Sequence, residues 1–92
     1  MALSQDQITR KLKTIGPWEQ DGDAIKRTFE LKNFKAALNF VNKVGDKAEE
    51  ADHHPDILLH GWNKVTITLS THSEGGLTEK DFSMAEKINQ QV

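Results

Sequence analysis

The four histidines of this 92-residue chain all lie within the segment EEADHHPDILLHGWNKVTITLSTH, from Glu49 to His72. His53 and His54 stand side by side before Pro55. Histidine has an unperturbed pKa of about 6.5, so it can both give and accept a proton near neutral pH. Histidines gathered around one loop therefore indicate an acid–base site.

A metal centre is the first alternative, because three histidines and a carboxylate would suit zinc. The spacing argues against it. His53 and His54 are neighbours, which point to opposite sides of an extended chain, and the sequence has no His-x-x-x-His pair. A serine nucleophile is also disfavoured, since Ser70 lies in an alternating strand pattern without a nucleophile elbow around it. Proton transfer by histidine is the chemistry that these residues favour.

The composition describes one small soluble domain over residues 1–92, with no second domain. The sequence contains no cysteine, which excludes disulfides, thiolate nucleophiles and cysteine metal sites, and is compatible with a reducing cytoplasm. No apolar run is long enough to cross a bilayer. The net charge of −2, with basic residues scattered along the chain, does not favour direct binding of nucleic acid.

Three helices are expected around these motifs. Ser4 and Gln7 form a capping-box signature before a helical pattern that runs to Ile15. Asn33 is placed to cap the longest helix, which we expect to end near residue 51. The last helix begins after Thr78, with Asp81 in the position of the capping-box carboxylate. The longest helix carries an apolar stripe made of Phe34, Ala37, Leu38, Val41, Val44 and Ala48.

Four strands are expected between the helices. The stretch WEQ, the signal Asp21-Gly22 and the alternating run AIKRTFEL predict one hairpin, with Arg27 as the exception on the apolar side. ILLH and KVTITLSTH predict a second hairpin. The element order is therefore α-β-β-α-β-β-α. We expect an α+β fold, a four-stranded antiparallel sheet with helices packed on one face.

Several of these residues together resemble the signature of the pterin-4a-carbinolamine dehydratase family. The resemblance consists of Glu49-x-x-x-His53-His54-Pro55, then Trp62, then His72, then Asp81, and it extends to GGLTEKDF and the closing helix. It implies the same α+β sandwich. It also implies dehydration of 4a-hydroxytetrahydrobiopterin to quinonoid dihydropterin in tetrahydrobiopterin recycling, without a metal or another cofactor.

The resemblance also implies roles for residues. His53 and His72 would be the acid–base pair, and His54 would bind and orient the pterin; which histidine acts as the acid is left open. The residues expected to contact substrate are Glu49, Trp62, Ser70, Thr71 and Asp81. For several of these a structural role is the alternative: Asp81 as a cap, Trp62 as a packed side chain and Ser70 and Thr71 as ordinary strand residues. His60 has no counterpart in the signature, and we interpret it as a surface residue.

Partners follow from the same resemblance. The family implies homodimers joined through the sheet and homotetramers joined through helices, and an open sheet with free edge strands favours association. The alternative function is a non-catalytic interaction or assembly module on the same fold, with a protein partner. The complete histidine set favours the enzyme, for which we expect a cytoplasmic location.

Overall fold

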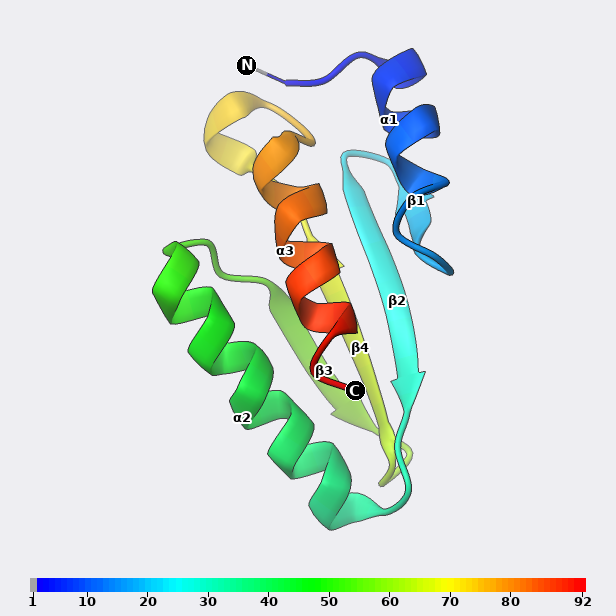
Figure 1. The fold of residues 1–92 in the computed structure, drawn as a ribbon, viewed down its shortest axis with the longest axis vertical. Helices are drawn as coiled ribbons and strands as arrows, with labels where there is room; N and C mark the ends of the chain where they lie inside the picture. The colour runs from blue at the N-terminus through cyan, green and yellow to red at the C-terminus, as the bar shows by residue number, and fades with distance from the viewer. Residues whose placement is uncertain (1) are drawn as a thin grey trace.

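The predicted element order and sheet are confirmed by the computed structural model, which describes residues 2–92 (Figure 1). The strands form one antiparallel sheet in the order β1-β2-β4-β3, and the three α-helices lie on one side of it. The elements are α1 (Gln5–Leu12), β1 (Glu19–Asp21), β2 (Ala24–Glu30), α2 (Phe34–Ala51), β3 (Asp56–His60), β4 (Lys64–Leu69), the 3₁₀ turn η1 (His72–Glu74) and α3 (Glu79–Asn89).

The helix starts follow the predicted caps. Ser4 and Gln7 form the reciprocal capping box of α1, and the Asn33 side chain accepts a hydrogen bond from the backbone N–H of Ala36 at the start of α2. The helix α1 ends at Leu12, earlier than predicted. Beyond it the backbone tightens into turns, in which the Ile15 N–H bonds to the Leu12 carbonyl.

The end of β4 differs from the sequence expectation. The alternating pattern predicts a strand that reaches His72, but β4 ends at Leu69. The N–H groups of Glu74 and Gly76 both donate to the Thr71 carbonyl, which turns the chain out of the sheet. His72 therefore begins the η1 turn instead of closing a strand.

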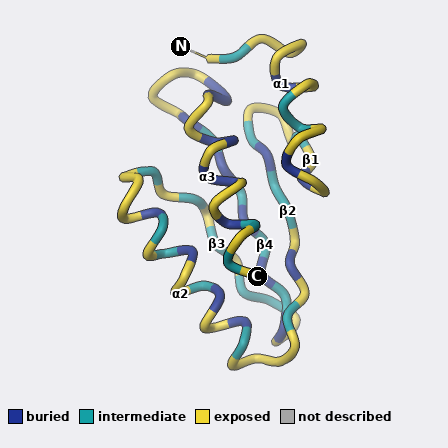
Figure 2. Tube along the Cα trace, viewed as in Figure 1, coloured by how far each residue is buried: buried dark blue, intermediate teal, exposed yellow. Residues whose placement is uncertain are grey.

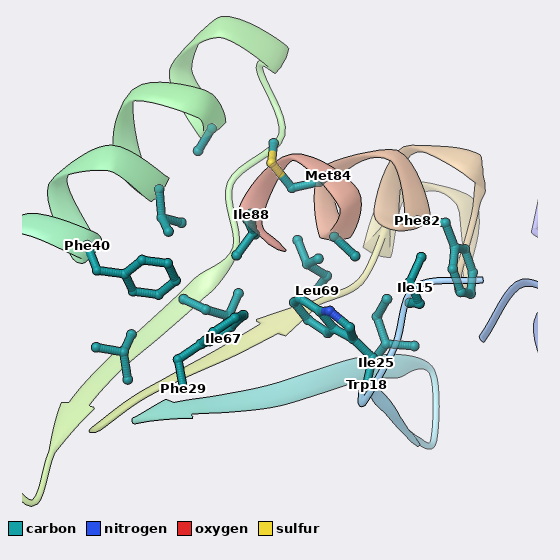
Figure 3. Close-up of a cluster of buried hydrophobic side chains, with 14 of the residues drawn as sticks. Ile15, Trp18, Ile25, Phe29, Phe40, Ile67, Leu69, Phe82, Met84 and Ile88 are labelled. Carbon is teal, nitrogen blue, oxygen red and sulfur yellow. The ribbon is translucent and has the colours of Figure 1, made fainter. Parts of the chain in front are cut away.

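The core lies between the sheet and the helices (Figures 2 and 3). The β2 and β4 strands bury their alternate residues against α2 and α3. Arg27, the predicted exception, lies over the Phe29 ring at 4.1 Å and donates to Asn89 Oδ1 at 2.7 Å; partial burial lowers the pKa of its guanidinium. Large buried side chains include Ile15, Trp18, Ile25, Phe29, Phe40, Val44, Val65, Ile67, Leu69, Phe82, Met84 and Ile88.

The apolar stripe of α2 was predicted only in part. Ala37, Val44 and Ala48 are buried as expected, and Phe40 is buried beside them. Phe34 and Leu38 are instead 50% and 42% exposed. Within residues 2–92, no helix combines the length and apolar character needed to span a membrane.

Candidate active site

The loop between α2 and β3 sends its two histidines in different directions. Asp52 ends α2 in the left-handed conformation, with φ of 50°, and the His53 N–H closes the helix end on the Ala48 carbonyl. The His53 side chain then turns inward and is only 12% exposed. That of His54 is 58% exposed and turns toward solvent. The side chains of His53 and His54 therefore point in opposite directions, as expected for neighbours in an extended chain.

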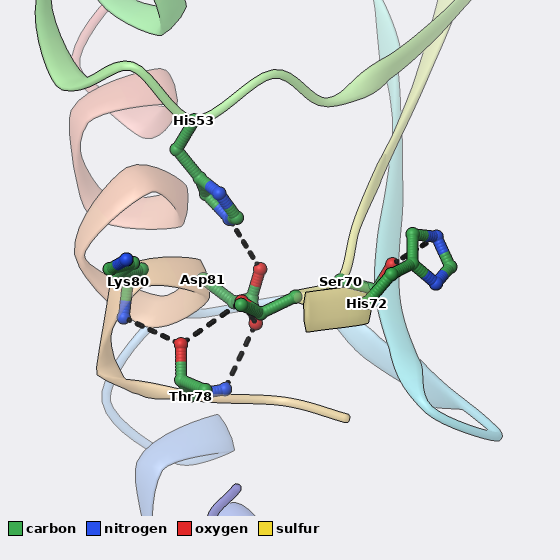
Figure 4. A network of polar contacts seen from close by, with 7 residues as sticks. His53, Ser70, His72, Thr78, Lys80 and Asp81 are labelled. Atoms are coloured by element: carbon green, nitrogen blue, oxygen red, sulfur yellow. Dashed lines mark hydrogen bonds and ion pairs between the residues drawn. The ribbon is translucent and has the colours of Figure 1, made fainter. Parts of the chain in front are cut away.

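The inward histidine meets a buried carboxylate. His53 Nε2 lies 2.7 Å from Oδ1 of Asp81, whose side chain is fully buried in the first turn of α3 (Figure 4). Asp81 Oδ2 accepts hydrogen bonds from the Thr71 hydroxyl at 2.8 Å and from the Thr78 backbone N–H at 3.0 Å. One side chain therefore completes the predicted capping box and also holds a histidine from a distant loop.

His72 lies on the other side of this carboxylate. It begins η1, directly after the buried Thr71, and its exposed side chain has Nε2 3.1 Å from Ser70 Oγ (Figure 4). The connection that leaves β4 and the loop that enters β3 meet at the same end of the sheet, because the two strands are antiparallel neighbours. The fold brings His53, His54 and His72 to that end.

Glu49 forms an exposed pair with the second histidine. Its carboxylate Oε2 contacts His54 Nε2 at 2.5 Å, one helical turn before the loop. Both side chains are more than half exposed. Since solvent screens exposed pairs, this contact contributes little stability and leaves both groups accessible to a ligand.

Trp62 is not brought to this end of the sheet within one chain. It lies in the turn between β3 and β4, with a positive φ of 58° and a side chain that is 62% exposed. The six residues of β4 span roughly 20 Å at about 3.3 Å each, and they separate this turn from His72. His60, near the same turn, bonds to Thr66 Oγ1 at 2.8 Å on the polar sheet face.

A pocket of about 270 Å³ opens beside His53, between the end of α2 and one face of α3. Sequence reasoning missed the α3 residues that line it, although they recur at the spacing of one helical face. Neither His54 nor His72 lines this pocket. Within residues 2–92, no three histidine or carboxylate side chains are grouped to hold a metal ion. The pocket residues are Ala51, His53, Glu79, Lys80, Ser83, Met84 and Lys87.

Comparison with known proteins identifies the family. The model of the family described as "Pterin 4 alpha carbinolamine dehydratase" matches residues 1–91. This chain belongs to that family. A protein of Sulfolobus acidocaldarius, provisionally named pterin-4-alpha-carbinolamine dehydratase, is 47% identical over 89 residues, which cover 97% of each chain. A protein of Thermomicrobium roseum with the same provisional name is 46% identical over 86 residues, 94% of this chain and 91% of the relative.

Solved structures share the dehydratase-family fold. A transcriptional coactivator/pterin dehydratase from Brucella melitensis is 35% identical and superposes with a TM-score of 0.93, over 99% of this chain and 98% of the other. A pterin dehydratase-like protein described as a RuBisCO assembly factor of the alpha-carboxysome is 20% identical, with a TM-score of 0.65 over 80% of this chain and 84% of the other. At that identity the likeness shows the fold alone.

Proposed function

We propose that this chain is a 4a-hydroxytetrahydrobiopterin dehydratase, which converts the 4a-carbinolamine to quinonoid dihydropterin and water in cytoplasmic tetrahydrobiopterin recycling. The observation that supports this most is the meeting of three histidines at one end of the sheet. One of them, His53, is held by a buried carboxylate beside a pocket. A protein with a purely structural role has no evident use for that arrangement.

The reaction needs two proton transfers around one flat ring. A general acid protonates the hydroxyl on C4a, the C4a–O bond breaks, and water leaves; a base takes the proton from ring N5, so no net proton is consumed. In the proposal, His53 and His72 perform these two transfers from the two segments that meet at the sheet end. His54, with Glu49 on its Nε2, binds and orients the pterin. Ser70 holds the His72 ring.

A coupled assay tests the proposal. A hydroxylase supplies 4a-hydroxytetrahydropterin, and absorbance follows quinonoid dihydropterin with and without this protein and its His53→Ala and His72→Ala variants. Loss of a general acid or base should slow the catalysed reaction by about 10²–10⁴-fold. Thr68→Ala on the outer face of β4 is the control, because the proposal gives Thr68 no role in the reaction or in the pairing of β3. Absence of any acceleration from the folded wild-type protein would refute the dehydratase.

The alternative is a non-catalytic partner role on the same fold. It is favoured by the solved relative at 35% identity, which is described as a transcriptional coactivator as well as a pterin dehydratase. A protein with that role would show no acceleration in the assay, and its histidine variants would keep partner binding. The two roles are compatible in one chain.

We also propose that the chain works as a homodimer or homotetramer. The β3 strand is an edge of the sheet with an unpaired side, and its central residue, Leu58, is 59% exposed. Antiparallel pairing of β3 with a second copy about Leu58 would set Asp56 opposite the partner subunit's His60, a complementary pair on one face. Phe34 and Leu38 on α2 offer a second apolar contact for a tetramer.

Such pairing would explain how Trp62 contacts substrate although it lies far from His72 in its own chain. In an antiparallel pair about Leu58, the turn that carries Trp62 lies beside the start of the partner subunit's β3, where the loop with His54 ends. Trp62 would then contact substrate in the site of the neighbouring copy, which its own chain cannot offer. This assignment keeps Trp62 as a substrate-binding residue only in the oligomer.

A further inference from the structure

A continuous set of hydrogen bonds connects the segments that carry His53 and His72. It runs from His53 Nε2 to Asp81 Oδ1 at 2.7 Å, and from Asp81 Oδ2 to the Thr71 hydroxyl at 2.8 Å. Thr71 is the residue immediately before His72 and is only 5% exposed. The buried hydroxyl and the buried carboxylate are therefore the direct side-chain link between the two halves of the candidate site.

Each hydrogen in this network can be assigned. An ionised Asp81 has no proton to give, so it accepts from every neighbour. The single hydroxyl proton of Thr71 goes to Asp81 Oδ2, which leaves the Thr71 oxygen to accept from the Thr78 hydroxyl at 3.0 Å. The Thr78 oxygen in turn accepts from the Lys80 N–H, and the Thr78 N–H donates to Asp81. Every donor and acceptor in this network has a partner only when the hydrogens are placed in this way.

That direction fixes the tautomer of His53. Because Asp81 only accepts, His53 Nε2 must carry the hydrogen of the neutral ring, and Nδ1 is left unprotonated. No hydrogen bond occupies His53 Nδ1 within residues 2–92. Nδ1 is then the ring nitrogen through which His53 can exchange a proton with a bound molecule.

The Thr71 backbone stabilises the turn that carries His72. Its carbonyl accepts the N–H groups of Glu74 and Gly76 and so closes the turn that His72 begins. The hydroxyl fixes the same residue to Asp81. Movement of Thr71 would therefore disturb the aim of the Asp81 carboxylate and the start of η1 together.

We propose that Thr71 is a positioning residue: through Asp81 its hydroxyl holds His53 as the Nε2–H tautomer, with Nδ1 as the working nitrogen, and fixes the turn that presents His72. Thr71 itself would not contact substrate. The consequences for catalysis rest on the proposed dehydratase function, whereas the tautomer of His53 does not.

The tautomer is measured first, on the wild-type protein. Long-range ¹H–¹⁵N correlation spectra of the histidine rings, at roughly pH 9 where a histidine ring is ordinarily neutral, should show a protonated Nε2 and an unprotonated Nδ1 for His53. A protonated Nδ1, or an averaged mixture of tautomers, would overturn the proposal whatever the protein catalyses.

The hydroxyl is then tested by variants of one side chain. Thr71→Val removes the donor at constant shape; His53 should become a mixture of tautomers, and kcat should fall by about tenfold or more with KM within about threefold. Thr71→Ser keeps the donor and should restore both readouts. Thr68→Val makes the same change on the outer sheet face and should behave as wild type. If Thr71→Val does not fold, Thr71→Cys, a weak donor of similar size, replaces it.

Unchanged tautomer and unchanged kcat in a folded Thr71→Val protein would reject a positioning role for Thr71. A wild-type protein with the expected tautomer but without dehydratase activity would instead reject the proposed function and leave the hydrogen-bond assignment intact. The two failures are therefore distinguishable.

Discussion

His53 Nε2 lies 2.7 Å from Asp81 Oδ1, although 28 positions separate the two residues in the sequence. The histidine comes from the loop after α2, and the carboxylate from the first turn of α3. Asp81 is fully buried, so its three donors replace the water that would otherwise solvate it. This contact makes the capping residue of one helix the support of a candidate catalytic side chain.

Replacing Asp81 with asparagine should lower activity strongly and destabilise the fold only moderately. The amide can offer an N–H where the carboxylate offered an acceptor, which would favour the opposite tautomer of His53. We expect kcat to fall by about 10²–10⁴-fold and the free energy of unfolding to fall by about 1–3 kcal/mol. Steady-state kinetics and urea unfolding measure the two effects. Asp6→Asn, in the exposed first turn of α1, is the control; equal losses in both variants would contradict a special role for Asp81.

Replacing Glu49 with glutamine should separate binding from stability. The Glu49–His54 pair is exposed, so we expect unfolding free energy to change by less than about 1 kcal/mol. In the proposed site the same change weakens the orientation of the pterin, and KM should rise while kcat changes less. Glu50→Gln, the exposed neighbour in the sequence, controls for the loss of charge. An unchanged KM would remove Glu49 from the site.

The sequence predicted the fold because its signals are local. Capping residues, alternating strands and turn signals act within a few residues, and the structure confirms the order of elements that they imply. The predicted end of β4 was wrong. The alternation of side chains continues past Leu69, whereas the backbone leaves the sheet in a turn that is closed by hydrogen bonds to the Thr71 carbonyl. A side-chain pattern carries no information about that backbone contact.

The candidate site could be predicted from the sequence less completely than the fold. The capping role of Asp81 was predicted, but its contact with His53 depends on how α3 packs against the loop after α2, which no local pattern encodes. Trp62 shows a different case: the sequence left it between a packed side chain and a substrate contact, and the structure places it in a turn at the far end of β4 from His72. Only the resemblance to a family placed it in the site, and a second copy is needed to reconcile the two.

Disruption of the β3 edge tests whether Trp62 contributes to the site of a second copy. Leu58→Lys should convert the proposed oligomer toward smaller species at micromolar concentration, measured by size exclusion with light scattering, because it places a charge at the centre of the pairing edge. KM should rise in the same variant, and Trp62→Ala should raise KM without changing the oligomer. Thr68→Lys lies on the same outer face but on the central strand β4, and should leave assembly intact. A wild-type monomer with full activity would exclude the shared site.

Two phenylalanines of α2 should differ sharply in their effect on stability. Phe40 is 2% exposed, and its ring centroid lies 4.8 Å from that of Phe29 in the core, whereas Phe34 is half exposed. Phe40→Ala should lower the unfolding free energy by about 3–5 kcal/mol, because it removes buried apolar contacts and leaves a cavity. Phe34→Ala should cost clearly less than Phe40→Ala in a monomer, because about half of the Phe34 surface stays in contact with water after folding. Urea unfolding at several protein concentrations measures both. A large loss for Phe34→Ala, together with an unfolding midpoint that depends on protein concentration in the wild type but not in the variant, would place that side chain in a helix-to-helix contact between subunits, because loss of the contact would uncouple unfolding from association.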